Sequence, residues 1–164
     1  MHIAVIARVL GILLMLFSLT MLSPILVAWG FGENTSPTFL LAFVITLLVG
    51  ILFWLPSKDS QGELRTRDGF IVTVFFWLVL STFGALPLML SEAPNLSFMD
   101  ALFESISGLT TTGATVISGL DDLPKSILYY RQQLQWLGGI GIVVIAVAIL
   151  PMLGVGGMQI FRAE

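Results

Sequence analysis

Four long stretches of this chain carry no charged side chain and are almost wholly apolar, and they limit the fold more than any other feature. They cover residues 9–32, 36–55, 69–91 and 134 to about 157. Each is long enough to cross a bilayer, which takes about 20 residues. Because an open chain can satisfy its backbone hydrogen bonds in hydrocarbon only as a helix, the sequence predicts an all-α integral membrane protein.

The composition agrees with a lipid environment and argues against several classes of protein. Hydrophobic residues make up 57% of the chain and charged residues only 10%, whereas soluble domains carry roughly a quarter charged residues. There is no cysteine and no run of basic residues, so we expect neither thiol chemistry nor nucleic-acid binding. The sequence has no phosphate-binding loop of the Walker type and no metal-ligand cluster, so we expect a protein that is not an enzyme and has no cofactor.

The charges outside the spans predict the orientation in the membrane. The segment 92–122 carries five acidic residues and no Lys or Arg. Basic residues flank the other side of the predicted spans, at Arg8, Lys58, Arg65, Arg67 and Arg162. The positive-inside rule then puts the N-terminus and the C-terminus in the cytoplasm, although Lys125 and Arg131 would lie outside.

Between the third and fourth spans lies a helical pattern that is too short to cross the bilayer. In FMDALFESISGL, the apolar residues that suit one face of a helix are Phe98, Ala101, Leu102, Ile106 and Leu109. Ser97 with Asp100 fits a capping box at its start, and Gly108 fits a glycine cap near its end. Such a helix can dip into the membrane and return only if it is buried in protein or lines a water-filled cavity.

These features divide the chain into three parts. We expect a transmembrane helical hairpin over 1–57, a cytoplasmic loop over 58–68, and one helix–re-entrant pore loop–helix unit over 69–164. The short helix and the loop after it occupy about 97–116 of that unit.

The loop after the short helix has the sequence GLTTTGAT, which is polar but uncharged. The C-terminal end of a helix carries partial negative charge and favours a nearby cation. Threonine suits an extended backbone, and Gly113 permits conformations that other residues resist. Successive carbonyls of such a segment can replace the water around a monovalent cation. The alternative is an ordinary turn or flexible loop, for which clusters of threonine and glycine are typical.

Two segments of the chain carry a resemblance to a known family. FMDALFESISGLTTTGATVI and SILYYRQQLQWLGGIGIVVIAVAILPMLGVGGMQIFRAE closely resemble the membrane subunit of bacterial Trk potassium-uptake systems, in the TrkH/TrkG/KtrB superfamily. The resemblance covers essentially the whole chain and is strongest over 97–164. It implies a protein of the bacterial inner membrane that takes part in potassium transport, with K⁺ as the transported ion and not as a cofactor.

The resemblance also implies which residues contact the ion. The family's filter carbonyls map onto Thr110, Thr111, Thr112 and Gly113, with Thr111 and Thr112 as the expected contacts of K⁺. Gly113 becomes the filter glycine. Ala114 and Thr115 follow in the same loop and are expected to support the filter.

One loop supplies only a quarter of such a filter, so the resemblance implies partners. In the family, one polypeptide carries a hairpin and four units, and a cytoplasmic nucleotide-binding ring regulates it. We therefore expect this chain to be the N-terminal quarter of a longer subunit, completed by three further pore units. Two alternatives stay open: a homotetrameric cation channel built from this chain, and a non-conducting membrane scaffold or truncated remnant.

Several further residues have two interpretations. Glu104 is an acid at membrane depth, which indicates function, and we prefer a hydrogen bond that braces the filter from behind. Asp121 and Asp122 concentrate cations at the outer mouth in one interpretation and are solvated loop acids in the other. Close helix packing is preferred over an ion-lining role for Gly138, Gly139 and Gly141.

Overall fold

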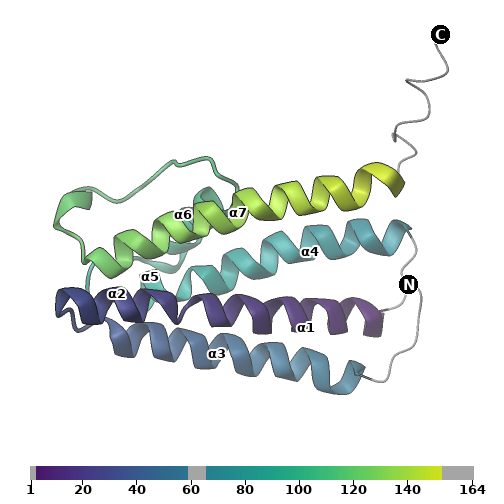
Figure 1. The fold of residues 1–164 in the computed structure, drawn as a ribbon, viewed down its shortest axis with the longest axis horizontal. Helices are drawn as coiled ribbons and strands as arrows, with labels where there is room; N and C mark the ends of the chain where they lie inside the picture. Colours follow the sequence, from purple (N-terminus) through teal and green to yellow (C-terminus); the bar gives the residue numbers. More distant parts are fainter. Residues whose placement is uncertain (1–2, 59–65, 153–164) are drawn as a thin grey trace, which may run out of the picture.

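The structure is a computed structural model that describes residues 3–58 and 66–152. Its long helices lie side by side with their axes roughly along one direction, and the short helix α6 lies among them (Figure 1). The elements in chain order are α1 (Ile3–Thr20), α2 (Ser23–Phe31), α3 (Ser36–Trp54), the 3₁₀ turn η1 (Leu55–Ser57), α4 (Thr66–Gly84), α5 (Leu86–Leu90), α6 (Phe98–Leu109), the 3₁₀ turn η2 (Leu120–Asp122) and α7 (Lys125–Met152).

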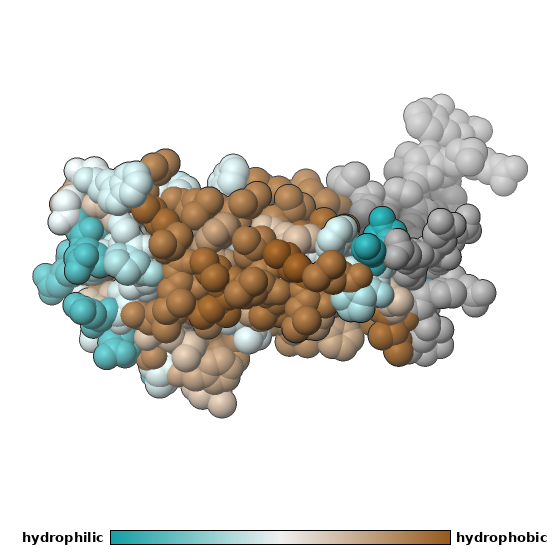
Figure 2. Space-filling view, turned by 90° about the horizontal axis from the view of Figure 1, so that it is seen from below, coloured by the Kyte–Doolittle hydropathy of each residue, from teal (hydrophilic) through white to brown (hydrophobic). Residues whose placement is uncertain are grey.

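The all-helical membrane fold is confirmed. Three helical stretches of the described residues are long and apolar enough to cross a membrane: Ile3–Phe31, Ser36–Ser57 and Asp68–Leu90. Hydrophobic side chains form a broad band around the middle of the molecule, and hydrophilic side chains gather at the end where α2 turns into α3 (Figure 2). Most of the predicted loop 58–68, the predicted end of the fourth span and Arg162 lie outside the described residues.

The hairpin is formed by α1 and α2 packed against α3. Where α1 crosses α3, two glycines bring the backbones into contact, because a Cβ added to Gly11 would lie 2.7 Å from the carbonyl oxygen of Gly50. The first span begins earlier than predicted, at Ile3, and is interrupted between α1 and α2 at Met21 and Leu22. Pro24 causes the interruption because it has no N–H to donate to the carbonyl of Thr20.

A second interruption separates α4 from α5. Here Pro87 lacks the N–H that would continue the helix, and the amide of Leu88 bonds the carbonyl of Ala85 at 3.1 Å. The carbonyl of Gly84 is left without its usual helical donor, and the hydroxyl of Tyr130 donates to it at 2.8 Å. Both helix breaks therefore follow from prolines in the sequence.

Helix α7 starts nine residues earlier than the predicted span, at Lys125 instead of residue 134. The sequence places Arg131 outside the membrane because it is charged, but its side chain lies inside the bundle and is only 11% exposed. The fully buried Tyr130 packs its ring edge-on against Phe39, with 5.5 Å between ring centroids. The first turns of α7 are therefore part of the protein core and not of a surface loop.

Helix α6 is enclosed by the bundle on one side. Its 12 residues extend about 18 Å, well short of the roughly 30 Å hydrocarbon layer. It packs against α7, α4 and α5. The loop 110–119 then runs back toward the end of the molecule that holds η2 (Figure 1). The predicted helix–re-entrant loop–helix arrangement is present.

Candidate functional site

The start of α6 is fixed by the capping box that the sequence predicts. The backbone N–H of Asp100 donates to the side-chain oxygen of Ser97 at 3.3 Å, and the Ser97 hydroxyl donates to the Asp100 carboxylate at 2.7 Å. This arrangement satisfies an amide that the first helical turn leaves free. Asp100 is exposed and acts at the helix start, as expected.

The end of α6 differs from the prediction. Gly108 is not the cap: it lies inside the helix, and Thr110 is the capping residue. Gly108 has a packing reason instead, because an added Cβ would lie 3.1 Å from the Cβ of Leu134 on α7. One helix turn further along α7, Gly138 meets the last residue of α6, and an added Cβ there would lie 1.9 Å from the carbonyl oxygen of Leu109. The close packing preferred for Gly138 is confirmed.

The buried face of α6 is small and polar. Its buried residues are Ala101, Glu104, Ser105, Ser107, Gly108 and Leu109. Phe98 and Ile106, which the apolar pattern groups on one face, are 46% and 40% exposed. The apolar pattern identifies the helix correctly but only part of the face that it buries: Ala101 and Leu109 are buried as predicted, and the other buried positions are polar or glycine.

The threonine–glycine loop turns sharply at the end of α6. The amides of Thr112 and Gly113 both donate to the carbonyl of Ser107, at 2.9 and 3.3 Å, and the amide of Thr111 donates to Gly108 at 2.9 Å. In a trans peptide, the carbonyl of one residue points opposite to the N–H of the next. The carbonyl oxygens of Thr110, Thr111 and Thr112 therefore point away from α6.

The exposed side of this loop is the side that those carbonyls face. Residues 110–116 are all exposed. Among the hydrogen bonds of the described residues, none ends on the carbonyl oxygens of Thr110, Thr111 or Thr112. The loop thus presents uncharged oxygens in succession, which is the arrangement that can take the place of water around a cation.

The threonine content predicts an extended loop backbone, but the observed backbone is not extended throughout. Thr111 has a φ of +58° and Gly113 a φ of +74°. A left-handed conformation is normal for glycine but strained for a β-branched residue such as Thr111. The hydrogen bonds from the loop amides to the last turn of α6 impose this turn. An added Cβ at Gly113 would meet no atom within 4 Å. Glycine is therefore favoured here by the positive φ angle and not by a lack of room for a side chain.

Glu104 connects the loop to α7. Its Oε1 accepts hydrogen bonds from the Thr115 hydroxyl at 2.5 Å and from the Val116 amide at 2.7 Å. Its Oε2 accepts from Nε and Nη2 of Arg131, at 3.1 and 2.8 Å. The Glu104 side chain is 2% exposed, so its charge is removed from water and is balanced by the guanidinium. The pair adds no net charge behind the loop.

Ser107 holds the middle of the loop. Its hydroxyl donates to the carbonyl of Ala114 at 2.6 Å, while its own carbonyl accepts the two loop amides. Ala114 and Thr115 are therefore both tied to α6. Neither Ser107 nor Arg131 is singled out for this site by the sequence. A buried acid needs a cation, and that requirement is the one signal that could point to Arg131.

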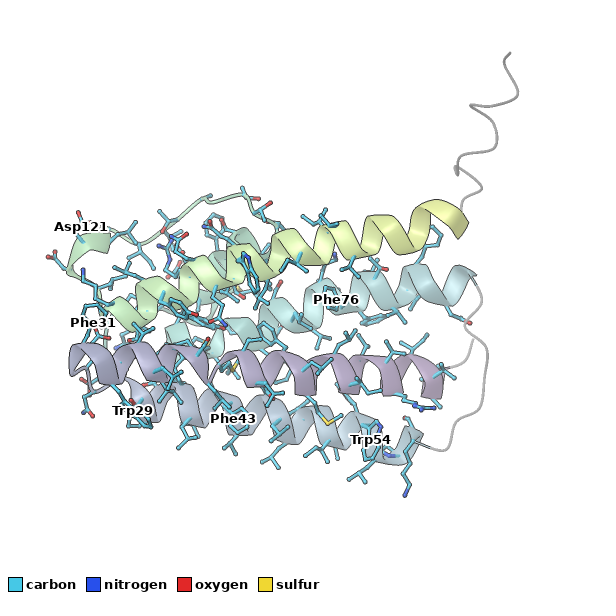
Figure 3. All side chains as sticks on the ribbon, in the orientation of Figure 1. Trp29, Phe31, Phe43, Trp54, Phe76 and Asp121 are labelled. Atoms are coloured by element: carbon cyan, nitrogen blue, oxygen red, sulfur yellow. The ribbon has the colours of Figure 1, made fainter. Side chains whose placement is uncertain are left out.

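Asp121 and Asp122 lie in η2, beyond the loop and at the end of the bundle that also holds Trp29 and Phe31 (Figure 3). Both are exposed. They help to line an open cavity of about 700 Å³, together with Glu33, Glu92 and Lys125. They therefore lie at one end of the bundle, beside this cavity.

A short helix that enters the bundle, followed by a returning loop with aligned carbonyls and a neutral ion pair behind it, defines a multi-pass membrane protein of the pore-loop class. Comparison with known proteins agrees with this class. The family described as "TrkH: Cation transport protein" matches residues 35–164. The chain belongs to this family.

The chain is similar to several characterised relatives. It is 60% identical over 164 residues to the Trk system potassium uptake protein TrkH of Halomonas elongata and 54% identical to that of Escherichia coli K12, covering all of this chain and 34% of each relative. The crystal structure of the potassium transporter TrkH from Vibrio parahaemolyticus has 53% sequence identity and a TM-score of 0.90, over 96% of this chain and 34% of that one. The chain thus spans about a third of the length of these relatives.

Proposed function

We propose that this chain forms the N-terminal part of a Trk-type potassium-uptake subunit and supplies one of the strands of its potassium filter. The observation that carries the proposal is the hydrogen bonding of the loop amides to α6. It commits the N–H groups of Thr111, Thr112 and Gly113 to the protein and turns the preceding carbonyls toward the exposed side. Family membership and the names of the relatives support potassium as the ion.

In this proposal the carbonyl oxygens of Thr110, Thr111, Thr112 and Gly113 coordinate dehydrated K⁺, with Thr111 and Thr112 as the main contacts. Glu104, Ala114 and Thr115 hold the loop in shape through the hydrogen bonds described above. Asp121 and Asp122 attract cations to the outer mouth. Three further pore units supply the other strands, and a cytoplasmic nucleotide-binding ring regulates the assembly.

The proposed location is the bacterial inner membrane, with the N-terminus and the C-terminus in the cytoplasm. The first turn of α1 and the last turn of α7 lie at the same end of the bundle, which agrees with termini on one side (Figure 1). Arg131 does not oppose this orientation, because it is paired with Glu104 inside the protein. Arg8 and Lys58 belong to the end that the positive-inside rule assigns to the cytoplasm.

Two glycines with the same left-handed backbone conformation provide the test. Gly113 and Gly32 have φ of +74° and +68°, and an added Cβ meets nothing within 4 Å at either position. Gly113→Ala and Gly32→Ala would be introduced into the complete subunit, and K⁺ and Na⁺ uptake would be measured in a bacterium that lacks its own potassium-uptake systems. We expect Gly113→Ala to lose K⁺ over Na⁺ selectivity and Gly32→Ala to keep it. Wild-type selectivity in Gly113→Ala would refute the filter role.

A further inference from the structure

Helix α7 is held by the N-terminal hairpin at two places, on a side different from the one that braces the loop. Glu33, in the turn between α2 and α3, contacts the first turn of α7. Gln133, two turns further along α7, contacts the break between α1 and α2. Arg131, which lies between these two contacts in the sequence, reaches Glu104 on α6.

Glu33 caps α7 from a distant part of the chain. Its Oε1 accepts from the amide of Lys125 at 2.5 Å, and its Oε2 accepts from the amide and the hydroxyl of Ser126 at 3.0 and 2.6 Å. The residue before the helix is Pro124, whose side chain cannot accept a hydrogen bond. The two free amides at the start of α7 are therefore satisfied by a carboxylate 92 and 93 positions away in sequence, which also suits the positive end of the helix. Thr35 adds a hydrogen bond of 2.7 Å to the Ser126 hydroxyl.

Gln133 fills the gap that Pro24 creates. The carbonyl of Thr20 loses its helical donor at the break and accepts instead from the Ser23 hydroxyl and from Nε2 of Gln133, each at 2.9 Å. Nε2 of Gln133 also donates to the Ser23 hydroxyl at 2.9 Å. The Oε1 of the same amide is buried without a hydrogen-bond partner in the described part of the chain, so the hydrogen bonds of this side chain all run through Nε2.

We infer that the hairpin is a positioning element of the transporter: Glu33 and Gln133 clamp α7 in the axial position and rotation at which Arg131 reaches Glu104, and so set the shape of the potassium-contacting loop. The inference rests on the proposed function of that loop. Glu33 and Gln133 are positioning residues, because they act on the loop only through α7.

The clamp can be loosened without changing any residue of the loop. Glu33→Gln removes the charge of the carboxylate, and Gln133→Leu removes the amide. Glu92→Gln is the matched control, because Glu92 is an exposed acid that lines the same cavity as Glu33. Each variant would be introduced into the complete subunit. The KM for K⁺ and the ratio of K⁺ to Na⁺ uptake would then be measured at equal amounts of protein in the membrane.

We expect Glu33→Gln and Gln133→Leu to change the KM or the uptake ratio by roughly twofold to thirtyfold, the range that mutations away from a site produce through coupling. Glu92→Gln is expected to behave like the wild type. If Glu33→Gln does not reach the membrane, Ser126→Ala removes the hydrogen bonds of the Ser126 hydroxyl to Glu33 and to Thr35 and is compared in the same way. Variants that are less abundant but keep the wild-type KM and ratio would show a structural role only and would overturn the inference.

A cross-link between the hairpin and α7 provides a rescue experiment for Glu33→Gln. The side-chain oxygens of Thr35 and Ser126 are 2.7 Å apart, and these 164 residues contain no cysteine. A disulfide between Thr35→Cys and Ser126→Cys should therefore fix the hairpin to α7 in the Glu33→Gln background and restore the wild-type KM and ratio on oxidation. Failure of an oxidised cross-link to restore them would refute positioning. If Gly113→Ala also transports like the wild type, the proposed function fails, and the inference fails with it.

Discussion

The contact between Gly138 and the end of α6 leads to the sharpest prediction. In Gly138→Ala, the new Cβ would lie 1.9, 2.6 and 2.8 Å from the carbonyl oxygen, the carbonyl carbon and the Cα of Leu109. These are backbone atoms, so no side-chain rotation can relieve the clash. Restoring even a 3.0 Å separation from the oxygen requires a movement of 3.0 − 1.9 = 1.1 Å between α7 and the end of α6.

Gly141→Ala is the matched control on the same helix. The nearest atom to its added Cβ, on Trp77, is 3.8 Å away, which is an ordinary contact. Both substitutions gain roughly the same 1 kcal/mol of helix propensity. Their difference therefore isolates the close contact, and overpacking of this kind costs roughly 1–3 kcal/mol. We expect Gly138→Ala to be less stable than Gly141→Ala by about this amount.

Two measurements test the reasoning. Unfolding of the purified complete subunit in detergent compares the stabilities of the two variants. Uptake of K⁺ and Na⁺ compares their selectivities, and we expect a loss only in Gly138→Ala, because Leu109 directly precedes the first loop carbonyl, at Thr110. Equal stability and equal selectivity of the two variants would refute both the close packing and its link to the loop.

Three further predictions concern the pair behind the loop, the loop backbone and the hairpin clamp. Arg131→Met should destabilise the protein by roughly 3–5 kcal/mol because it leaves the buried Glu104 carboxylate unbalanced, and adding Glu104→Gln should recover part of the loss. A double-mutant cycle of unfolding checks this, and full additivity would contradict it. Thr111→Gly should be at least as stable as the wild type, because relief of a left-handed β-branched residue, worth roughly 1–2 kcal/mol, offsets the cost of a glycine. Thr110→Gly, where φ is −81°, gains no such relief, and a greater stability of Thr110→Gly in thermal unfolding would contradict the strain. Burial raises the pKa of the Glu33 carboxyl, but the hydrogen bonds from Ser126 and Lys125 lower it by more, so the pKa lies below the ordinary 4.5. The stability that this clamp contributes is therefore present above pH 4.5 and lost as the pH falls through the lowered pKa. In thermal unfolding from neutral to acid pH, Glu33→Gln should lose less stability than the wild type. Equal losses of stability would argue against the clamp.

The sequence predicts the helical fold well, because a charge-free apolar stretch has few alternatives to a helix in lipid. It places α3 almost to the residue, with 36–55 predicted and Ser36–Trp54 observed. It misplaces the start of α7, because Arg131 and Gln133 are polar and a single sequence cannot show that their partners lie inside the bundle. Polarity alone does not separate a surface turn from a satisfied polar core.

The sequence predicts where the candidate site lies, between two spans, but it does not predict the geometry of the site. Threonine favours extended backbone, yet Thr111 is left-handed, because the carbonyls of Ser107 and Gly108 capture the loop amides. Gly108 has the position of a cap in the sequence, and only its contact with Leu134 explains it. Such features depend on how closely α6 and α7 approach, which the residue pattern does not record.

The ion pair between Glu104 and Arg131 has a consequence for how the protein is made. The acid is synthesised 27 residues before the arginine that balances it. Until α7 has been translated, the buried face of α6 would bring an uncompensated carboxylate and several hydroxyls into hydrocarbon, which is costly. The hairpin and α4 can enter the bilayer as each leaves the ribosome, but α6 gains its counter-charge only with α7. We therefore expect the threonine–glycine loop to settle in the membrane last, together with the helix α7 that follows it.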